Sequence, residues 1–187
     1  LVDLDGNKLS DDDFPINKAG FIIHSAIHQA RPKDLHCVMH SHEINSQTLA
    51  ASKSKLIPLT QEGCQLYERV GYHEFNGIVL NDEEKEKLIN AIGNEKHTLL
   101  MRNHGLITAG PTAAWAFIRH QHFIRNAEVQ LKLMASNAEM SIISDNILKH
   151  TREQFEGGSA QAGAKVRHPE WPAFWRLLDT LDEKWKH

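Results

Sequence analysis

Short apolar runs alternate with longer amphipathic segments along the chain. Residues 35–40 and 98–101 are the clearest mostly apolar runs, and both are followed by polar residues. Runs of this length are typical of strands buried inside a sheet. We therefore predict strands at these two positions.

Five segments have the apolar spacing or the end signals of helices. They cover residues 19–30, 44–53, 61–70, 81–92 and a long segment that starts at Thr112 after Gly110-Pro111. Asn17 and Asn81 are the predicted N-caps of the first and fourth helices, because an asparagine side chain accepts hydrogen bonds from free backbone N–H groups. Glu84 completes a capping box with Asn81, and Gly93 is the predicted C-cap. Gly71 is expected to end the third helix.

Strands that alternate with helices indicate a layered α/β domain. Residues 57–59 are expected to form a connector or a brief strand. Residues 154–165 are rich in glycine, alanine and glutamine and have few apolar anchors, so we expect a mobile loop there. No linker divides the 187 residues, which are enough for one sizeable core, so residues 1–187 are expected to form a single domain.

Charge and cysteine usage exclude several classes of partner. The formal net charge is −3 without a basic block, so neither nucleic acid nor an anionic membrane surface is expected to bind. The sequence shows neither an apolar run of transmembrane length nor a signal-peptide pattern. Cys37 and Cys64, in a predicted strand and a predicted helix, do not resemble a disulfide framework, so a reducing cytoplasm is the expected location.

Histidines stand at the ends of both predicted strands. His40 and His42 are two apart, so their side chains leave a strand on the same face and can meet at one ion. His104 follows the second strand, where Gly105 permits a sharp turn. In a chain with thirteen histidines, a His-x-His pair alone also fits two ordinary surface or core-edge residues. The third histidine favours a catalytic metal site, in which three imidazoles leave one position open.

Other histidine pairs are weaker candidates. His24 and His28 lie four apart on the first predicted helix, but no general-base glutamate accompanies them, and a packed, hydrogen-bonded His24 is the favoured interpretation. His120 and His122 point about 200° apart on a helix and cannot bind one ion, so they are expected at the surface or an interface. The nitrogen-rich strand-end set suits Zn²⁺, with Fe, Co and Mn as alternatives.

The order of these features resembles the class II aldolase/adducin family over almost the whole chain. The motifs are Leu1-Val2-Asp3-Leu4-Asp5-Gly6; Ile16-Asn17-Lys18-Ala19-Gly20-Phe21 with His24; Arg31-Pro32 before the His-x-His strand; Arg102-Asn103-His104-Gly105-Leu106 with Gly110; and residues 170–179. The last of these is similar to the adducin-like bacterial branch. The resemblance implies a three-layer α/β/α fold with a central mixed, largely antiparallel sheet. It also implies that an N-terminal portion, which carries an anion-binding turn in the family, precedes this sequence.

The resemblance further implies a metal-dependent lyase of a small-molecule substrate, with His40, His42 and His104 as ligands. Family aldolases carry an acidic residue four positions before the matching helix histidine, and here that position is Gly20, which cannot move a proton. Loss of carbon dioxide needs no base. Decarboxylation or aldol-type cleavage of a small hydroxy or keto acid or sugar derivative, through a metal-stabilised enolate, is therefore favoured over sugar-phosphate aldol chemistry.

Glu62 is the expected proton donor, because family aldolases present a residue from this region to the neighbouring subunit's site. A capping or salt-bridged glutamate is the alternative. Glu43 directly follows the His-x-His pair, but strand alternation puts it on the face opposite His42. The family also implies a homo-oligomer, a tetramer, with the site at a subunit boundary. The alternative function is a non-catalytic, adducin-like binding or scaffold protein. The three histidines favour an enzyme, whereas Gly20 at the expected acid position disfavours one.

Overall fold

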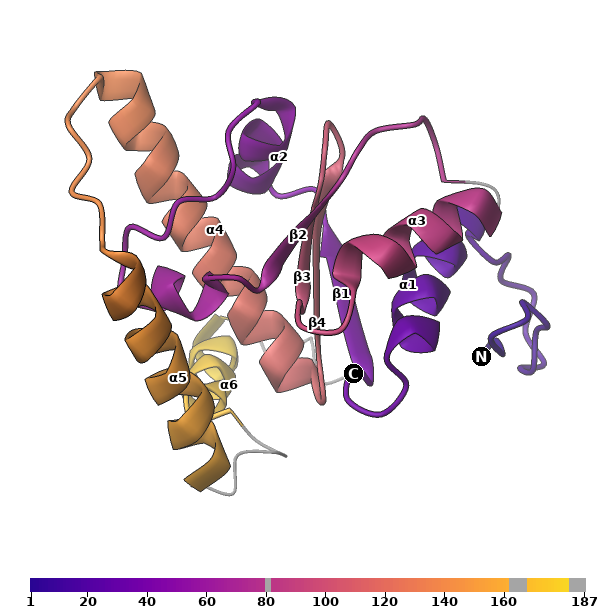
Figure 1. The fold of residues 1–187 in the computed structure, drawn as a ribbon. Coiled ribbons are helices and arrows are strands. Elements are labelled where there is room, and N and C mark those ends of the chain that lie inside the picture. Colours follow the sequence, from indigo (N-terminus) through magenta and orange to yellow (C-terminus); the bar gives the residue numbers. More distant parts are fainter. Residues whose placement is uncertain (80–81, 162–167, 182–187) are drawn as a thin grey trace.

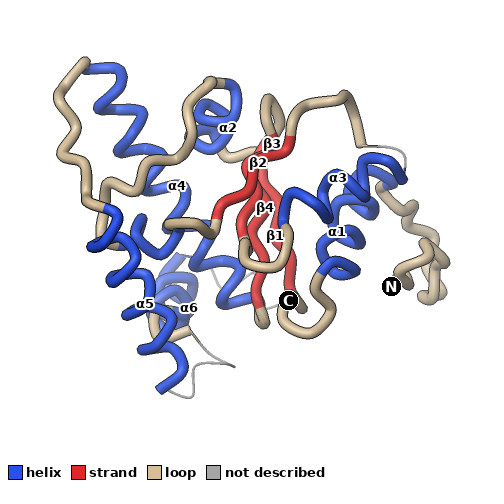
Figure 2. Tube along the Cα trace, in the orientation of Figure 1, coloured by secondary structure: helices blue, strands red, loops and turns tan. Residues whose placement is uncertain are grey.

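The structure is a computed structural model that describes residues 1–79, 82–161 and 168–181. Within these residues, a four-stranded sheet lies between two groups of helices (Figures 1 and 2). Its strands are β1 (Cys37–Ser41), β2 (Val70–His73), β3 (Thr98–Met101) and β4 (Gly105–Gly110), in the spatial order β1-β4-β3-β2. β4 pairs antiparallel with both β1 and β3, whereas β2 and β3 are parallel. The expected mixed, largely antiparallel sheet is confirmed.

Helices surround this sheet. They are α1 (Lys18–Ala30), α2 (Ile44–Ala51), α3 (Asp82–Ile92), α4 (Ala113–Ser136), α5 (Asp145–Gln161) and α6 (Trp171–Leu181), with a short 3-10 helix, η1, at Glu62–Leu66. The N-terminal hairpin is closed by one bridge between Val2 and Lys8.

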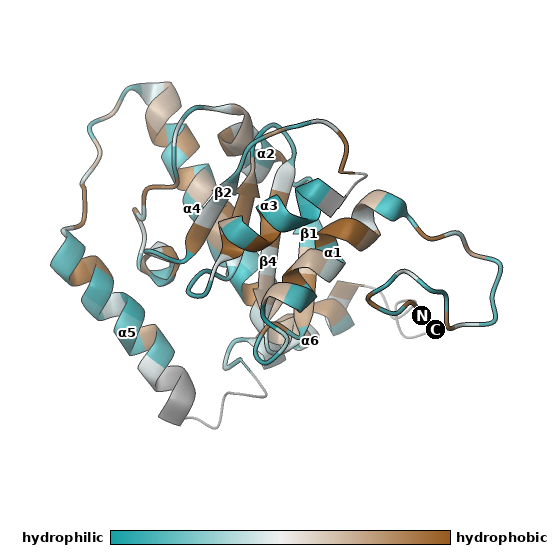
Figure 3. Cartoon of the chain, turned by 45° about the vertical axis from the view of Figure 1, so that its right-hand side comes forward, coloured by the Kyte–Doolittle hydropathy of each residue, from teal (hydrophilic) through white to brown (hydrophobic). Residues whose placement is uncertain are grey.

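Each face of the sheet has its own hydrophobic core. Leu99 of β3 is buried with Ile27 of α1 and Leu88 of α3. The next residue, Leu100, is buried with Leu49 of α2 and Phe123 of α4 on the other face. Successive strand side chains point to opposite faces, so these two leucines join the cores into three layers. Figure 3 shows hydrophobic residues along the strands and α1, whereas α5 is largely hydrophilic.

The predicted ends of α1 and α4 are confirmed. The Asn17 side chain accepts a hydrogen bond from the Gly20 N–H at 3.0 Å, and Thr112 caps α4 by accepting from the Trp115 N–H. Gly93 has a φ of +53°, the left-handed conformation expected after a helix. The predicted cap Asn81 lies outside the described residues.

The helix predicted over residues 61–70 is wrong. Only Glu62–Leu66 is helical, and Val70–His73 forms strand β2, whose residues alternate between partly buried and buried. A side chain at Gly71 would place its Cβ 2.4 Å from the carbonyl oxygen of Ala91. Gly71 therefore allows α3 to approach the strand, and it does not end a helix.

The mobile loop predicted over residues 154–165 is wrong as far as Gln161, because α5 continues to that residue. Residues 162–165 lie outside the described chain. The Glu156 carboxylate binds the Arg69 guanidinium at 2.9 Å, and this contact attaches α5 to the start of β2. Residues 57–59 form an irregular connector, in which the Ile57 N–H donates to the Gln130 side chain at 2.8 Å. That residues 1–187 form a single domain stays a prediction.

Candidate metal centre

His40, His42 and His104, hereafter the histidine cluster, meet at one end of the sheet. Antiparallel pairing places His40 opposite Ile107, beside the turn between β3 and β4 that contains His104. The ring centroids are 4.9 Å apart for His40 and His42, 4.9 Å for His40 and His104, and 4.7 Å for His42 and His104. One ring nitrogen from each residue can be chosen so that all three lie within 4.8 Å of one another. The three expected ligands therefore converge.

Hydrogen bonding fixes the tautomer of His40. Its Nδ1 lies 3.0 Å from the carbonyl oxygen of Leu106, which can only accept, so Nδ1 carries the proton. The lone pair is then on Nε2, which lies 3.0 Å from Nε2 of His42. Two nitrogens on a tetrahedral Zn²⁺ ion are separated by roughly 3.3 Å, given Zn–N bonds of about 2.0–2.1 Å.

Burial favours the uncharged forms of His40 and His104. It lowers the pKa of His40 to about 4, against the opposing hydrogen bond to Leu106, and the neighbouring His104 and His42 lower it further. Burial is also the largest cause of the lowered pKa of His104, and the neighbouring His42 and His73 lower this pKa further. At neutral pH both imidazoles offer lone pairs instead of competing protons. His42 is exposed, so the cluster opens to solvent.

The turn that presents His104 is built differently from the sequence-based expectation. The left-handed residue is Asn103, with a φ of +54°, and not Gly105. Gly105 is needed for space, because an added Cβ would lie 2.4 Å from the Ser41 carbonyl oxygen and 2.9 Å from Cδ2 of His42. Gln47 donates to the His104 carbonyl oxygen at 3.1 Å and links the turn to α2.

The prediction that His120 lies at the surface or an interface is wrong within the chain, since it is 1% exposed. The Thr108 hydroxyl donates to the Ala116 carbonyl oxygen at 2.8 Å and therefore accepts from Nδ1 of His120 at 3.0 Å. Nε2 of His120 then accepts from the Ser41 hydroxyl at 2.6 Å. His120 thus fixes the strand between two cluster residues. Its helical spacing from the buried Ala116 and Phe123 could have revealed this position.

The same prediction is wrong for His122, which is 3% exposed. Its Nδ1 lies 3.3 Å from Oε1 of Gln65, and its Nε2 lies 3.4 Å from a carboxylate oxygen of Glu170. His122 therefore belongs to the packing between η1, α4 and the segment before α6. His120 and His122 thus have different hydrogen-bond partners.

The two candidate acids have different surroundings. Glu43 caps α2, because its carboxylate accepts from the Ser46 N–H and from the Asn45 side chain, both at 3.0 Å. Glu62 is partly buried at the start of η1. No hydrogen bond or ion pair joins Glu62 to the histidine cluster within the described chain.

Gly20 borders a cavity of about 430 Å³ between α1 and the N-terminal segment. Lys8, Asp12 and His24 also line this cavity. His24 is close enough to His40 to contribute to the lowered pKa of His40. Where the resemblance expects an acid, the chain therefore has open space near the histidine cluster.

The donor set fits a divalent metal ion. Three imidazoles can present lone pairs to one point, and an exposed member leaves room for a further ligand. Nitrogen donors of this kind suit Zn²⁺, Fe, Co or Mn better than the oxygen-preferring Mg²⁺ or Ca²⁺. The histidine cluster therefore could hold one divalent ion at this end of the sheet.

The chain belongs to the class II aldolase/adducin family. The family model described as "Class II Aldolase and Adducin N-terminal domain" matches residues 1–131. A Pseudomonas aeruginosa protein provisionally named an aldolase class 2 protein is 35% identical over 178 residues, which span 95% of this chain and 68% of that protein. An adducin-related protein of Schizosaccharomyces pombe is 34% identical over 192 residues. This match covers 99% of this chain and 58% of the Schizosaccharomyces pombe protein. The solved L-fuculose 1-phosphate aldolase of Glaciozyma antarctica is 25% identical, with a TM-score of 0.71 over 82% of this chain and 59% of that one.

Among the described residues, the structure contains no helix with the length and apolar character needed to cross a membrane.

Proposed function

We propose that this protein is a metal-dependent lyase that cleaves or decarboxylates a small hydroxy or keto acid or sugar derivative. The observation that carries the proposal is the convergence of His40, His42 and His104, with the tautomer of His40 fixed by Leu106. The family membership and the similarity to a solved sugar-phosphate aldolase support a lyase. Zn²⁺ is the ion that the ligand set favours.

When bound, the ion supplies a Lewis acid that stabilises negative charge on a substrate oxygen as the neighbouring carbon–carbon bond breaks. The other residues of the chain would orient the metal-binding histidines and transfer the proton. Leu106 orients His40, and the bond between His120 and Ser41 fixes the strand that carries the pair. Gly20 offers no proton-transfer group. A reaction that loses carbon dioxide, and needs a proton only afterwards, matches that site best.

We propose Glu62 as the source of that proton, supplied by a second copy of the chain in a homotetramer. This arrangement is consistent with the absence of a contact between Glu62 and the histidine cluster within the described chain. It explains how a partly buried carboxyl at the start of η1 can serve a site at the end of β1. Light scattering that gives a monomer at micromolar concentration would contradict it.

The proposal is tested with purified, metal-loaded protein and a panel of hydroxy and keto acids, ketose phosphates, and dihydroxyacetone phosphate with aldehydes. We expect carbon dioxide or a carbonyl product from an acid and weak turnover of sugar phosphates. Glu62→Gln should lower turnover by at least tenfold, in the range of general acid catalysis, while the exposed control Glu86→Gln should not. Strong aldol turnover that survives Glu62→Gln would refute the proposed chemistry.

Subunit complementation tests the shared site directly. Mixed His104→Ala and Glu62→Gln chains should recover part of the activity, because some pairs of subunits would combine one intact histidine cluster with one intact Glu62. No recovery after verified mixing would exclude a shared site.

A binding or scaffold protein is the second candidate, because the matched family model includes the adducins and Gly20 replaces the expected acid. Metal bound by the histidine cluster without turnover of any substrate in the panel would favour it.

A further inference from the structure

A second polar cavity, of about 500 Å³, lies at the end of the sheet opposite the histidine cluster. Pro111, which follows β4, and Leu35, which precedes β1, are among its lining residues. The register pairs Cys37 with Gly110 at this end and Ser41 with Leu106 at the other. In Figure 1 the loop between α1 and β1 lies at the bottom, and the turn between β3 and β4 lies at the top beside α2.

Three guanidinium groups line this cavity, which we call the arginine cavity: those of Arg31, Arg69 and Arg119. They surround His97, which is 6% exposed. Burial is the largest cause that lowers the pKa of His97 far below its usual value. The positive charges of Arg119, Arg69 and Arg31 lower this pKa further. His97 is therefore neutral, and the positive charge of the cavity comes from the arginines.

Arg119 is the arginine of this cavity that forms no ion pair with any described residue. Its Nη1 donates to the Ala109 carbonyl oxygen, and its guanidinium carbon lies 5.2 Å from the centre of the Trp115 ring. Its Nε is buried and meets no hydrogen-bond acceptor among the described residues. The carboxylates of Glu156 and Asp34 raise the pKa of Arg119 but do not form an ion pair with it. Arg119 is partly buried, and a desolvated cation that forms no close ion pair is costly in a folded protein.

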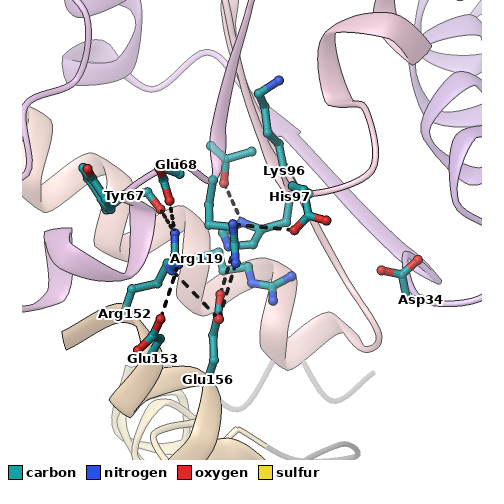
Figure 4. A network of polar contacts seen from close by, with 12 residues as sticks. Asp34, Tyr67, Glu68, Lys96, His97, Arg119, Arg152, Glu153 and Glu156 are labelled. Atoms are coloured by element: carbon teal, nitrogen blue, oxygen red, sulfur yellow. Dashed lines mark hydrogen bonds and ion pairs between the residues drawn. The ribbon is translucent and has the colours of Figure 1, made fainter. Parts of the chain in front are cut away.

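The acids of the cavity stand at its rim and bind the other two arginines. Asp34 pairs with Arg31, and Glu156 pairs with Arg69 at 2.9 Å. These carboxylates are 50% and 45% exposed, against 18% and 15% for the arginines that they contact. Figure 4 shows His97, Arg119 and Glu156 gathered in one region, with Asp34 at its edge.

Close ion pairs therefore engage Arg31 and Arg69, whereas Glu156 and Asp34 act on Arg119 without forming an ion pair with it among the described residues. The cavity is lined by four cationic side chains, the three arginines and Lys33, and by three carboxylates, those of Asp34, Glu95 and Glu156. Planar guanidinium forks bind phosphate through two parallel hydrogen bonds, a geometry that lysine cannot reproduce.

We propose that the arginine cavity is a binding site for a small phosphate-bearing anion, separate from the histidine cluster and independent of its chemistry. The anion binds the free side of the Arg119 fork, and Arg31 and Arg69 add charge from either side. Neutral His97 can donate or accept one further hydrogen bond.

The test is titration calorimetry with inorganic phosphate in chloride buffer on the full chain. Wild type should bind phosphate at millimolar or lower concentration, and His42→Ala should bind it equally well. Arg119→Lys should weaken binding at least fivefold, since it keeps the charge and loses the fork. Arg125→Lys, at an exposed position of the same helix, is the matched control and should bind like wild type.

A second variant is expected to strengthen phosphate binding, so its result does not depend on whether the protein tolerates a substitution at Arg119. Glu156→Gln removes a rim carboxylate that occupies Arg69, and it should tighten phosphate binding roughly threefold. Glu153→Gln, on the same helix but outside the cavity lining, should leave binding unchanged. The proposal is overturned if wild type binds no phosphate, if binding disappears in His42→Ala, if folded Arg119→Lys binds like wild type, or if Glu156→Gln fails to tighten binding.

Discussion

Three imidazole rings face one another where β1 ends, whereas three guanidinium groups surround a single imidazole near the place where β1 begins. Burial lowers the pKa of His40 at the first end and of His97 at the second. The other neighbours differ. His40 faces two other imidazole rings that can share a cation with it, whereas the arginines around His97 repel a further cation. The comparison teaches that the partners of a histidine, and not its burial, decide whether it can bind a metal ion.

Gly105→Ala should have the largest effect at the histidine end. The new Cβ would lie 2.4 Å from the backbone oxygen of Ser41, which cannot move without disturbing the pairing of β1 and β4. We expect the free energy of unfolding to fall by about 3 kcal/mol and metal binding to be lost.

Denaturant unfolding and metal analysis measure both effects. Gly157→Ala is the control, because nothing lies within 4 Å of an added Cβ in α5. That change should raise the stability by about 0.5–1 kcal/mol. A Gly105→Ala protein with wild-type stability and metal content would contradict this account of the turn.

His42→Ala should remove the metal and leave the fold largely intact, because His42 is exposed. The control is His36→Ala, an exposed histidine just before the other end of the same strand. We expect metal content, measured by inductively coupled plasma spectrometry, to fall from about one ion per chain to background in the first variant only. Equal loading of both variants would place the metal elsewhere.

The meeting of the three histidines was predictable from the sequence because it depends on local periodicity. The two-residue spacing of His40 and His42 needs only a strand, and His104 needs only a turn after another strand. The family resemblance supplied the sheet type and the order of the layers. These features are encoded by neighbouring residues or by motifs in a fixed order.

The mistaken predictions concern features that depend on distant contacts. In the sequence, Gly71 resembles the end of a helix. Its role depends on Ala91 of α3, which lies against it in the fold and cannot be inferred from the segment around Gly71. His120 resembles a surface residue until Ser41 and Thr108 are placed against it. The arginine cavity joins residues from several separate segments, so its sequence signal is dispersed.

At the arginine end, stability should depend on acid through His97. Its pKa in the folded protein is far below the ordinary 6.5, which is close to its value in the unfolded chain. The unfolded chain therefore binds a proton first, and the stability present above pH 6.5 is lost as pH falls below it. This group contributes a slope of about 1.4 kcal/mol per pH unit.

Urea unfolding between pH 6.5 and 5, in chelator, measures this slope. His97→Gln should reduce it by nearly one proton, even if the variant is less stable at neutral pH. His36→Gln should retain the wild-type slope, because that histidine is exposed. An unchanged slope in His97→Gln would show that His97 is not kept neutral by its surroundings.

The smallest effect is expected at Asn103, where the backbone adopts a φ of +54° immediately before His104. Alanine pays about 1 kcal/mol in this conformation, because its Cβ crowds the following carbonyl oxygen, whereas glycine does not. Asn103→Ala should therefore lower the free energy of unfolding by about 1 kcal/mol, and Asn103→Gly by less than half of that. The Asn103 N–H donates to the Ala50 carbonyl oxygen at 3.2 Å, a backbone contact that both variants retain. Equal losses in the two variants would show that the asparagine side chain, and not the backbone conformation, holds His104 in place.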